Sequence, residues 1–159
     1  PLVSAGQLER VDGHVARARS EGARLVSGGG PLRRDRTGHY YAPTLFADAD
    51  PAMAVAREEI FGPVAFVIPA VDYDHALALA NDTPFGLSAA ICTASLARAE
   101  HFRRNAEAGM VMINLPTSGA DYHVPFGGRK ASSLGPREQG GMAREFYTTV
   151  KTAYVHAGD

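Results

Sequence analysis

The stretch Val64-Ala65-Phe66-Val67-Ile68 is a continuous apolar run, which is typical of a β-strand covered on both faces. Two more apolar runs follow it at residues 87–93 and 110–113. Between the three runs lie segments with apolar residues at helical spacing, which begin at the helix-capping residues Asp72 and Ser95. Strands and helices that alternate with short connections predict the α/β class, with an open, mainly parallel sheet flanked by helices.

The residues before this stretch predict a helix, a strand and a loop. Ser4-Ala5-Gly6-Gln7 has the pattern of a capping box, in which the Ser hydroxyl and the Gln side chain both satisfy orphan backbone groups. Helical spacing continues to a C-terminal cap at Gly22, and residues 23–27 have the pattern of a short strand. Residues 28–38 are rich in Gly and Arg and predict an exposed loop, whereas residues 40–46 are expected to be extended.

The pattern changes after the last apolar run. Residues 115–134 are rich in Pro, Gly and Ser, and a loop of this length in a compact domain is usually functional or disordered. Residues 141–146 predict a short helix. Residues 147–155 are β-branched or aromatic at nearly every position, which favours a terminal strand that is free to pair with another sheet.

The composition excludes several classes of protein. The chain has 159 residues, of which 45% are apolar and 21% charged, as is ordinary for one globular domain. Its net charge of −1 gives no long-range attraction to nucleic acid or to an anionic membrane. No apolar run approaches the roughly 20 residues that span a bilayer. The six His residues lack metal-ligand spacing, so we expect no metal site.

Cys92 is the single cysteine of the chain. No internal disulfide can form, and this suits a reducing compartment, so we expect a cytoplasmic protein. The residue lies in the apolar run at 87–93, where a thiol behaves as a small hydrophobic side chain. Because no local His or Asn signature accompanies it, we do not expect Cys92 to be a nucleophile, and we assign no catalytic residue to the chain.

Residues 57–63, Arg-Glu-Glu-Ile-Phe-Gly-Pro, are the most informative motif for function. Pro63 fixes its own φ and favours an extended Gly62, so the residues before it are held rather than mobile. The ionised carboxylate of Glu59 can accept hydrogen bonds from two vicinal hydroxyl groups, which is what a ribose offers. From the spacing alone, a solvated Glu59 and a Phe61 in the core are an equally good interpretation.

With these motifs the chain closely resembles the C-terminal part of the aldehyde dehydrogenase superfamily. The ordered matches cover nearly the whole chain, and together they are far more specific than any single motif. They comprise residues 1–4, 42–45, 58–63, 80–88, 108–110, 125–130 and 151–154. The resemblance implies part of the catalytic domain over residues 1–140, and the C-terminal helix and strand of the oligomerisation element over residues 141–159.

The resemblance also implies roles for individual residues. Glu59 would bind the nicotinamide ribose of NAD or NADP, and Phe61 would lie beside the nicotinamide ring. Phe126 would line the tunnel for the aldehyde, and Asn114 would hold loop backbone at the end of the last core strand. A Phe126 that is simply buried in a Gly-rich connection is the alternative for that residue.

Within the family, the motifs at residues 114–117, 121–124 and 135–140 look most like 2-oxoglutarate-semialdehyde (2,5-dioxopentanoate) dehydrogenases. This resemblance implies NAD(P)-dependent oxidation of an aldehyde to a carboxylate by a homo-oligomer. The nucleophilic Cys and the general-base Glu of the family lie upstream of the matched segments, so we expect a C-terminal fragment that is inactive alone. The alternative is a non-catalytic binding or assembly module that pairs through its terminal strand.

Overall fold

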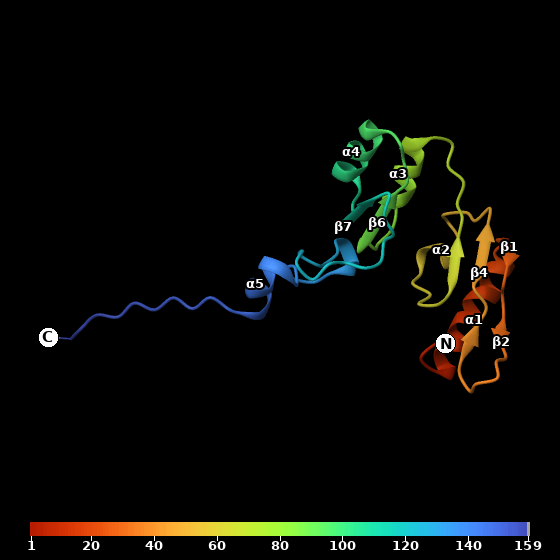
Figure 1. Ribbon diagram of the computed structural model, residues 1–159, viewed down its shortest axis with the longest axis horizontal. Coiled ribbons are helices and arrows are strands. Elements are labelled where there is room, and N and C mark those ends of the chain that lie inside the picture. Colours follow the sequence, from red (N-terminus) through yellow and green to blue (C-terminus); the bar gives the residue numbers. More distant parts are fainter. Residues whose placement is uncertain (159) are drawn as a thin grey trace. The chain divides into compact units, whose positions relative to one another are not determined.

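The computed structural model describes residues 1–158, and the chain forms two compact units that divide between residues 79 and 80 (Figure 1). Both units combine helices with β-strands, as the α/β prediction requires. Helix α3 (Tyr73–Asn81) runs across the division. The predicted ranges of 1–140 for the catalytic-domain part and 141–159 for the terminal element remain predictions.

In the first unit, α1 (Ala5–Ser20) begins after Ser4, whose hydroxyl accepts a hydrogen bond from the backbone N–H of Gln7 at 3.1 Å. This half of the predicted capping box is confirmed. The side chain of Gln7 turns elsewhere, because its amide nitrogen donates to the carbonyl oxygens of Ile60 at 3.1 Å and Phe61 at 3.0 Å. A tertiary contact to residues 60–61 thus takes the place of the other half of the box.

The first unit contains a three-stranded sheet in the order β1-β4-β5. Its strands are β1 (Arg24–Ser27), β4 (Thr44–Ala47) and β5 (Val64–Phe66). The pair β4 and β5 is parallel, whereas β1 runs antiparallel to β4. The strand at residue 64 is therefore in a parallel pair, but its partner is β4, and the expectation that it shares a sheet with the apolar runs at residues 87–93 and 110–113 is wrong for the described residues.

Two short elements of the first unit differ from the sequence-based expectation. Within the predicted loop, β2 (Pro31–Leu32) pairs with β3 (Tyr40–Tyr41), because the extended backbone at 40–41 offers it hydrogen-bonding partners. Helix α2 (Ala54–Arg57) was not predicted either. Its first turn has no side-chain cap at Met53, so the usual signal for a helix start is missing.

One hydrophobic core joins α1 to the sheet and to α2. Val11 and Phe46 have no exposed surface, and the rings of Phe46 and Phe66 stack with centroids 5.2 Å apart. This core fixes where α1 lies against the segment that enters β5. The buried members are Val11, Val15, Ala18, Ala23, Tyr41, Phe46, Val55 and Ile60.

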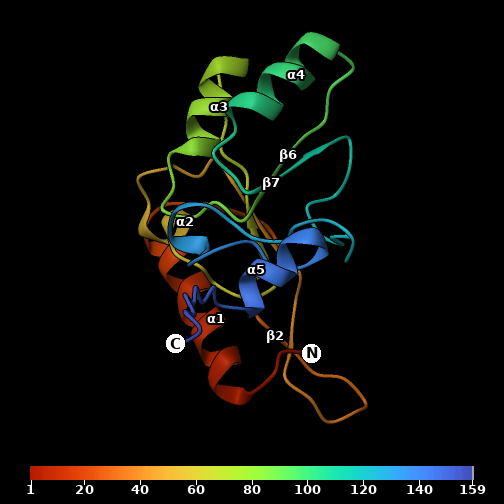
Figure 2. The same cartoon turned by 90° about the vertical axis from the view of Figure 1, so that its left-hand side faces the viewer.

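The second unit is built on a strand–helix–strand motif, as predicted. Strands β6 (Ser88–Ile91) and β7 (Met110–Ile113) lie side by side in parallel, and α4 (Leu96–Asn105) connects them (Figure 2). The Ser95 hydroxyl accepts a hydrogen bond from the backbone N–H of Arg98 at 3.3 Å, which confirms the predicted cap. Asp72 likewise accepts from the backbone N–H of His75 at the start of α3, at 2.8 Å.

The strands are less buried than their apolar sequences predict. No residue of β5, β6 or β7 is fully buried, and Ala65 and Ala90 are exposed. Cys92 follows β6 directly and is also exposed, so its expected place in a buried strand is wrong. The burial of a strand depends on what lies on each of its faces, and its own residues do not determine that.

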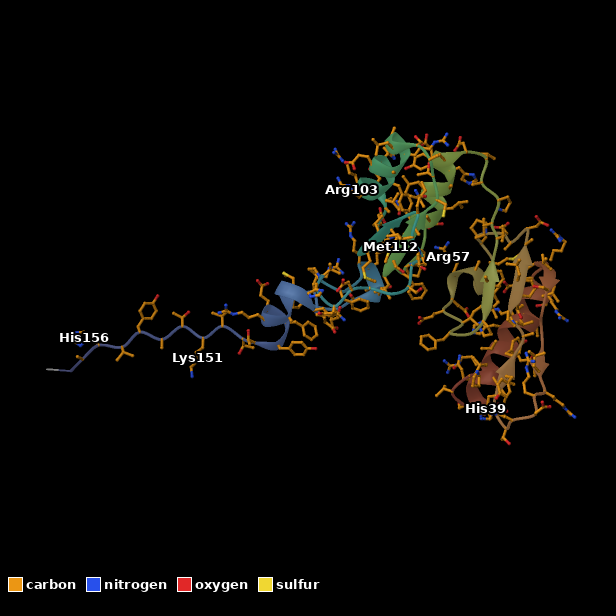
Figure 3. All side chains as sticks on the ribbon, viewed as in Figure 1. His39, Arg57, Arg103, Met112, Lys151 and His156 are labelled. Atoms are coloured by element: carbon orange, nitrogen blue, oxygen red, sulfur yellow. The ribbon has the colours of Figure 1, made fainter. Side chains whose placement is uncertain are left out.

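The C-terminal residues depart most from the prediction. The end of the chain contains two 3₁₀ turns (Lys130–Ser132 and Gly140–Met142) and helix α5 (Ala143–Tyr147). Tyr147 ends this helix, so the prediction that it begins a strand is wrong. Residues 148–158 are extended and exposed, and Lys151 and His156 project from this segment (Figure 3). A strand needs a partner edge, so the predicted oligomerisation strand stays a prediction.

Candidate functional site

The motif at residues 57–63 forms a corner between α2 and β5. Helix α2 ends at Arg57, and Glu58 is already extended, with φ −104° and ψ 147°. The Ile60 side chain is buried in the core, whereas Phe61 has φ +54° and is 76% exposed. A positive φ is unusual for a bulky residue and persists only where the surroundings over-determine it. The corner thus turns one apolar side chain inward and the next outward.

The two carboxylates of the corner differ in their surroundings. Glu58 accepts two hydrogen bonds from the Arg17 guanidinium, at 3.0 and 3.2 Å, and lies 3.8 Å from a ring nitrogen of His14. Arg17 also donates to Glu21 at 2.9 Å, and Glu21 and Glu58 together raise the pKa of Arg17. Glu59 is exposed, and within residues 1–158 no hydrogen bond or ion pair engages its carboxylate. Glu59 is therefore the member of the pair that is available to a ligand.

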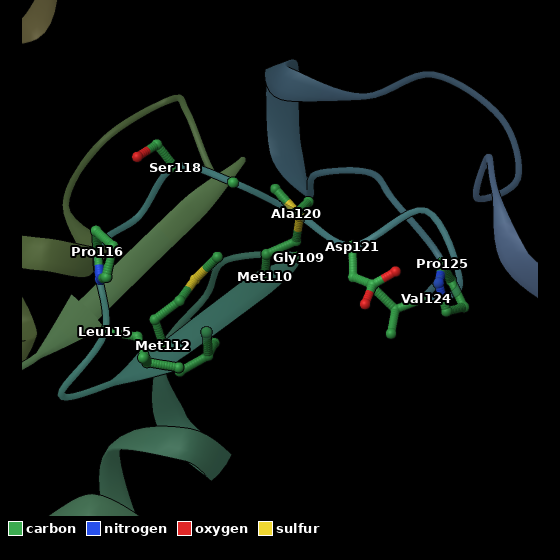
Figure 4. Close-up of a pocket in the computed structure, with 12 residues that line it drawn as sticks. Gly109, Met110, Met112, Leu115, Pro116, Ser118, Ala120, Asp121, Val124 and Pro125 are labelled. Carbon is green, nitrogen blue, oxygen red and sulfur yellow. The ribbon is translucent and has the colours of Figure 1, made fainter.

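A pocket of about 560 Å³ lies in the second unit, between β7 and the long loop (Figure 4). Its walls are mainly apolar, and Asp121 contributes a carboxylate at one side. Phe126 is half-buried and is not one of the lining residues. The side chains that line the pocket include those of Met110, Met112, Leu115, Pro116, Asp121 and Val124.

Asn114 stands at the end of β7 with φ +56°. Its side-chain oxygen accepts a hydrogen bond from the backbone N–H of Thr93 at 2.8 Å, and its amide nitrogen donates to the Thr93 carbonyl at 3.0 Å. One side chain thus binds both backbone groups of a residue that lies just beyond β6. The contact joins the ends of the two parallel strands where the long loop begins.

The Gly-rich end of the loop is held by backbone and side-chain contacts within the second unit. The backbone N–H of Arg129 donates to Gly86 at 2.8 Å, and Gly86 donates to the Ser132 hydroxyl at 3.0 Å. Lys130 forms an ion pair with Glu107 at 2.7 Å, which lowers the pKa of Glu107. Residues 129–132 are therefore anchored, although they belong to a segment that the sequence describes only as a loop.

Asp121 and His123 form a local turn beside the pocket. One Asp121 carboxylate oxygen accepts from the backbone N–H of His123 at 2.9 Å and lies 2.8 Å from its ring Nδ1. The backbone hydrogen bond, and then the ring contact, lower the pKa of Asp121. The His123 ring also contacts Tyr122, with centroids 3.8 Å apart. These side chains give the loop polar groups, and the turn places them together.

Among residues 1–158, no group of three or more His, Cys, Asp or Glu side chains is arranged to hold a metal ion. Within the same residues, the helices are too short or too polar to cross a membrane.

Comparison with known proteins supports the resemblance of the sequence motifs. The model of the aldehyde dehydrogenase family matches residues 1–153. An alpha-ketoglutarate semialdehyde dehydrogenase of Haloferax volcanii is 46% identical over 97% of this chain. A betaine aldehyde dehydrogenase of Rhizobium meliloti is 45% identical over 99%. The chain covers 33% and 32% of these proteins, so it spans about a third of their length.

The fold agrees with solved structures of the same kind. An indole-3-acetaldehyde dehydrogenase of P. syringae, solved with NAD⁺, superimposes with a TM-score of 0.89 at 38% identity. The match covers 98% of this chain and 31% of that protein. At this identity and coverage, both the fold and the order of its elements are shared.

Proposed function

The chain belongs to the aldehyde dehydrogenase family, and from this premise we propose that it supplies the C-terminal third of an NAD(P)-dependent aldehyde dehydrogenase. In the proposed whole enzyme, an aldehyde is oxidised to a carboxylate. In that whole enzyme, the nucleophilic thiol and the general base belong to the parts of the family's sequence that this chain does not cover. The chain itself contributes part of the cofactor site and part of the aldehyde pocket, and it is inactive alone.

The corner at residues 57–63 carries this proposal. Bound NAD(P)⁺ would supply the acceptor for the hydride that leaves the substrate. Glu59 offers an exposed carboxylate with no other partner in the described residues, which suits the two hydroxyl groups of a ribose. Phe61, two residues further along the chain, offers an exposed ring, and the buried Ile60 between them holds the backbone against the core. A hydrogen-bond acceptor for the ribose and an exposed ring beside it together fit the nicotinamide half of the cofactor.

We assign the aldehyde side of the reaction to the second unit. Asn114 would keep the start of the long loop in place through its two hydrogen bonds to Thr93. Phe126 would line the aldehyde tunnel shortly before the anchored residues 129–132. The motif at 121–124 and the Haloferax relative support 2-oxoglutarate semialdehyde as the substrate. We place the enzyme in the cytoplasm as a homo-oligomer, supported by the single Cys92 and by the exposed terminal segment.

A second candidate function is a binding or assembly module without catalysis. The exposed segment at residues 148–158 favours it, because Val150, Tyr154 and Val155 are each more than 90% exposed. Apolar and β-branched side chains in an extended segment are suited to adding a strand to a neighbouring sheet. A chain that stays monomeric in light scattering at high concentration would contradict this alternative.

A chimera tests the proposed enzyme function. Residues 1–153 would replace the corresponding third of the Haloferax relative, and turnover would be measured by the formation of reduced nicotinamide. We expect the folded chimera to oxidise 2-oxoglutarate semialdehyde. Glu59→Gln should raise the KM for NAD(P)⁺ by roughly tenfold to a hundredfold, as the loss of charge-assisted hydrogen bonds predicts.

The matched control is Glu9→Gln, because Glu9 is an exposed residue of α1 and loses the same charge. It should leave the KM for the cofactor unchanged. A folded chimera without turnover would contradict the proposed function. Turnover by the chain alone would contradict its description as an inactive part.

A further inference from the structure

The side chain of Gln7 connects α1 to the candidate cofactor corner. Its amide nitrogen donates to two successive carbonyl oxygens, those of Ile60 at 3.1 Å and Phe61 at 3.0 Å. The residues joined in this way are more than 50 positions apart in the sequence. The start of α1 does not need this side chain, because Ser4 already accepts from the backbone N–H of Gln7.

The two carbonyl groups belong to the peptide planes on either side of the Phe61 Cα. The relative rotation of those two planes is what φ and ψ of Phe61 describe. One nitrogen atom that holds both oxygens therefore restrains both dihedral angles. This matters at Phe61, because a φ of +54° is unfavourable for an aromatic residue unless contacts hold it.

Other residues of α1 support the same corner on its two flanks. Val11 packs against Gly62 so closely that a Cβ on Gly62 would come within 2.5 Å of the Val11 Cγ2. On the other flank, Arg17 binds both carboxylate oxygens of Glu58. The helix thus contacts the corner before, at and after Phe61, and Gln7 is the contact at its centre.

We infer that Gln7 is a positioning residue for the cofactor. By holding the peptide groups on both sides of Phe61, it keeps the ring turned outward and keeps the preceding Glu59 in a fixed place. This inference rests on the proposed function, because it assigns the nicotinamide half of NAD(P)⁺ to Glu59 and Phe61. It adds that the neutral side-chain amide of Gln7, on α1, fixes the positions of Glu59 and Phe61.

Two substitutions of nearly equal size test the inference in the chimera. Gln7→Met keeps the length of the side chain and removes both donors. Gln7→Glu also removes them and sets a carboxylate against two carbonyl oxygens. We expect the KM for NAD(P)⁺ to rise about tenfold in Gln7→Met, which corresponds to about 1.4 kcal/mol, and further in Gln7→Glu. The KM for the aldehyde should not change in either variant.

A control variant separates positioning from stability. Val15→Ala removes buried methyl groups from the same helix while leaving the Gln7 side chain and its two hydrogen bonds unaltered, and it should lower the melting temperature. It should not change the KM for the cofactor. If Val15→Ala raised this KM as much as Gln7→Met does, the effect of Gln7 would be one of stability alone and the inference would be overturned.

A second readout needs no cofactor and no chimera. In the chain alone, the intraresidue NOE between the amide and α protons of Phe61 reports the sign of its φ, because these two protons lie closest together at a positive φ. We expect a strong NOE in the wild-type chain and a weaker, averaged NOE in Gln7→Met. An unchanged NOE would overturn the inference, even if the kinetic result agreed with it.

The outcomes also distinguish this inference from the proposed function. If Glu59→Gln and Phe61→Leu leave the KM for NAD(P)⁺ unchanged in the chimera, the proposed function fails, and with it the role of Gln7 for the cofactor. If those two variants raise the KM and Gln7→Met does not, the proposed function stands and the positioning inference alone is wrong.

Discussion

Replacing Gly62 with alanine should destabilise the first unit, because the corner leaves no room for a side chain there. The added Cβ would lie 2.5 Å from the Val11 Cγ2 and 3.2 Å from its Cγ1. Val11 has no exposed surface, and a valine in a helix has one strongly preferred rotamer. It therefore cannot rotate away, and the backbone of the corner has to move instead.

The size of the effect follows from two opposing terms. Overpacking of a filled core costs typically about 1–3 kcal/mol. Alanine in place of glycine returns about 0.4–1 kcal/mol by restricting the unfolded chain. At the middle of both ranges, the net loss is about 1.3 kcal/mol of unfolding free energy. For a unit of residues 1–79, this corresponds to a fall in melting temperature of roughly 5–10 °C.

Native-state hydrogen exchange of the Val11 and Phe46 amides would measure this loss within the first unit alone. Gly13→Ala is the matched control, because Gly13 lies inside α1 with nothing within 4 Å of an added Cβ. That variant should be more stable than the wild type by about 0.5–1 kcal/mol. If Gly62→Ala were as stable as the wild type while Gly13→Ala gained stability, the close contact between α1 and the corner would be refuted.

Two further predictions concern stability in each unit. Burial, and then the hydrogen bond to Asp12 at 2.8 Å, raise the pKa of Tyr41. In the unfolded chain the Tyr41 hydroxyl ionises near pH 10, whereas in the folded unit it stays protonated at that pH. The free energy of unfolding should therefore fall as the pH rises above about 10. Urea unfolding of Tyr41→Phe should show a weaker fall, and an identical pH profile would contradict the burial. In the second unit, Ser95→Ala should cost about 1 kcal/mol by removing the cap at Arg98, and equal amide protection of α4 in both proteins would argue against that cap.

Local elements were predictable from the sequence because their signals are local. Ser4, Asp72 and Ser95 cap the helices that they were expected to cap, since a hydroxyl or carboxylate needs only the backbone N–H groups of the next turn. The parallel pair β6 and β7 follows from two apolar runs with a helix between them. Helix α2 gave no such signal, because Met53 cannot cap it.

Features that depend on distant partners were predicted poorly. The apolar strands were expected to be buried on both faces, and Cys92 with them, but burial depends on what covers each face. Residues 31–32 pair with residues 40–41 although they were expected to be loop, and Tyr147 is helical although it has a strand-like composition. In each case, the burial or the secondary structure of the residues depended on whether another segment of the chain lies against them.

The candidate site shows the same division. The order of residues in the motif and the resemblance to a family both indicate Glu59 and Phe61, and both side chains are exposed on a corner that the core holds. Gln7 was recognised only as part of a capping box, because its spacing from Ser4 matches one. Its contact with Ile60 and Phe61 leaves no mark in the local sequence, since it joins segments far apart in the chain.

The amino-acid sequence by itself therefore determined the family of this protein and the type and order of most of its elements, and it supplied the two residues that we propose for the cofactor site. These properties follow from side-chain chemistry and from spacing along the chain. Only the tertiary structure decided that β4 pairs with β1 and β5 and that β2 pairs with β3, which faces stay exposed, and that one helix holds the strained peptide groups around Phe61. Such contacts depend on where distant segments meet, and that position results from the packing of the core as a whole.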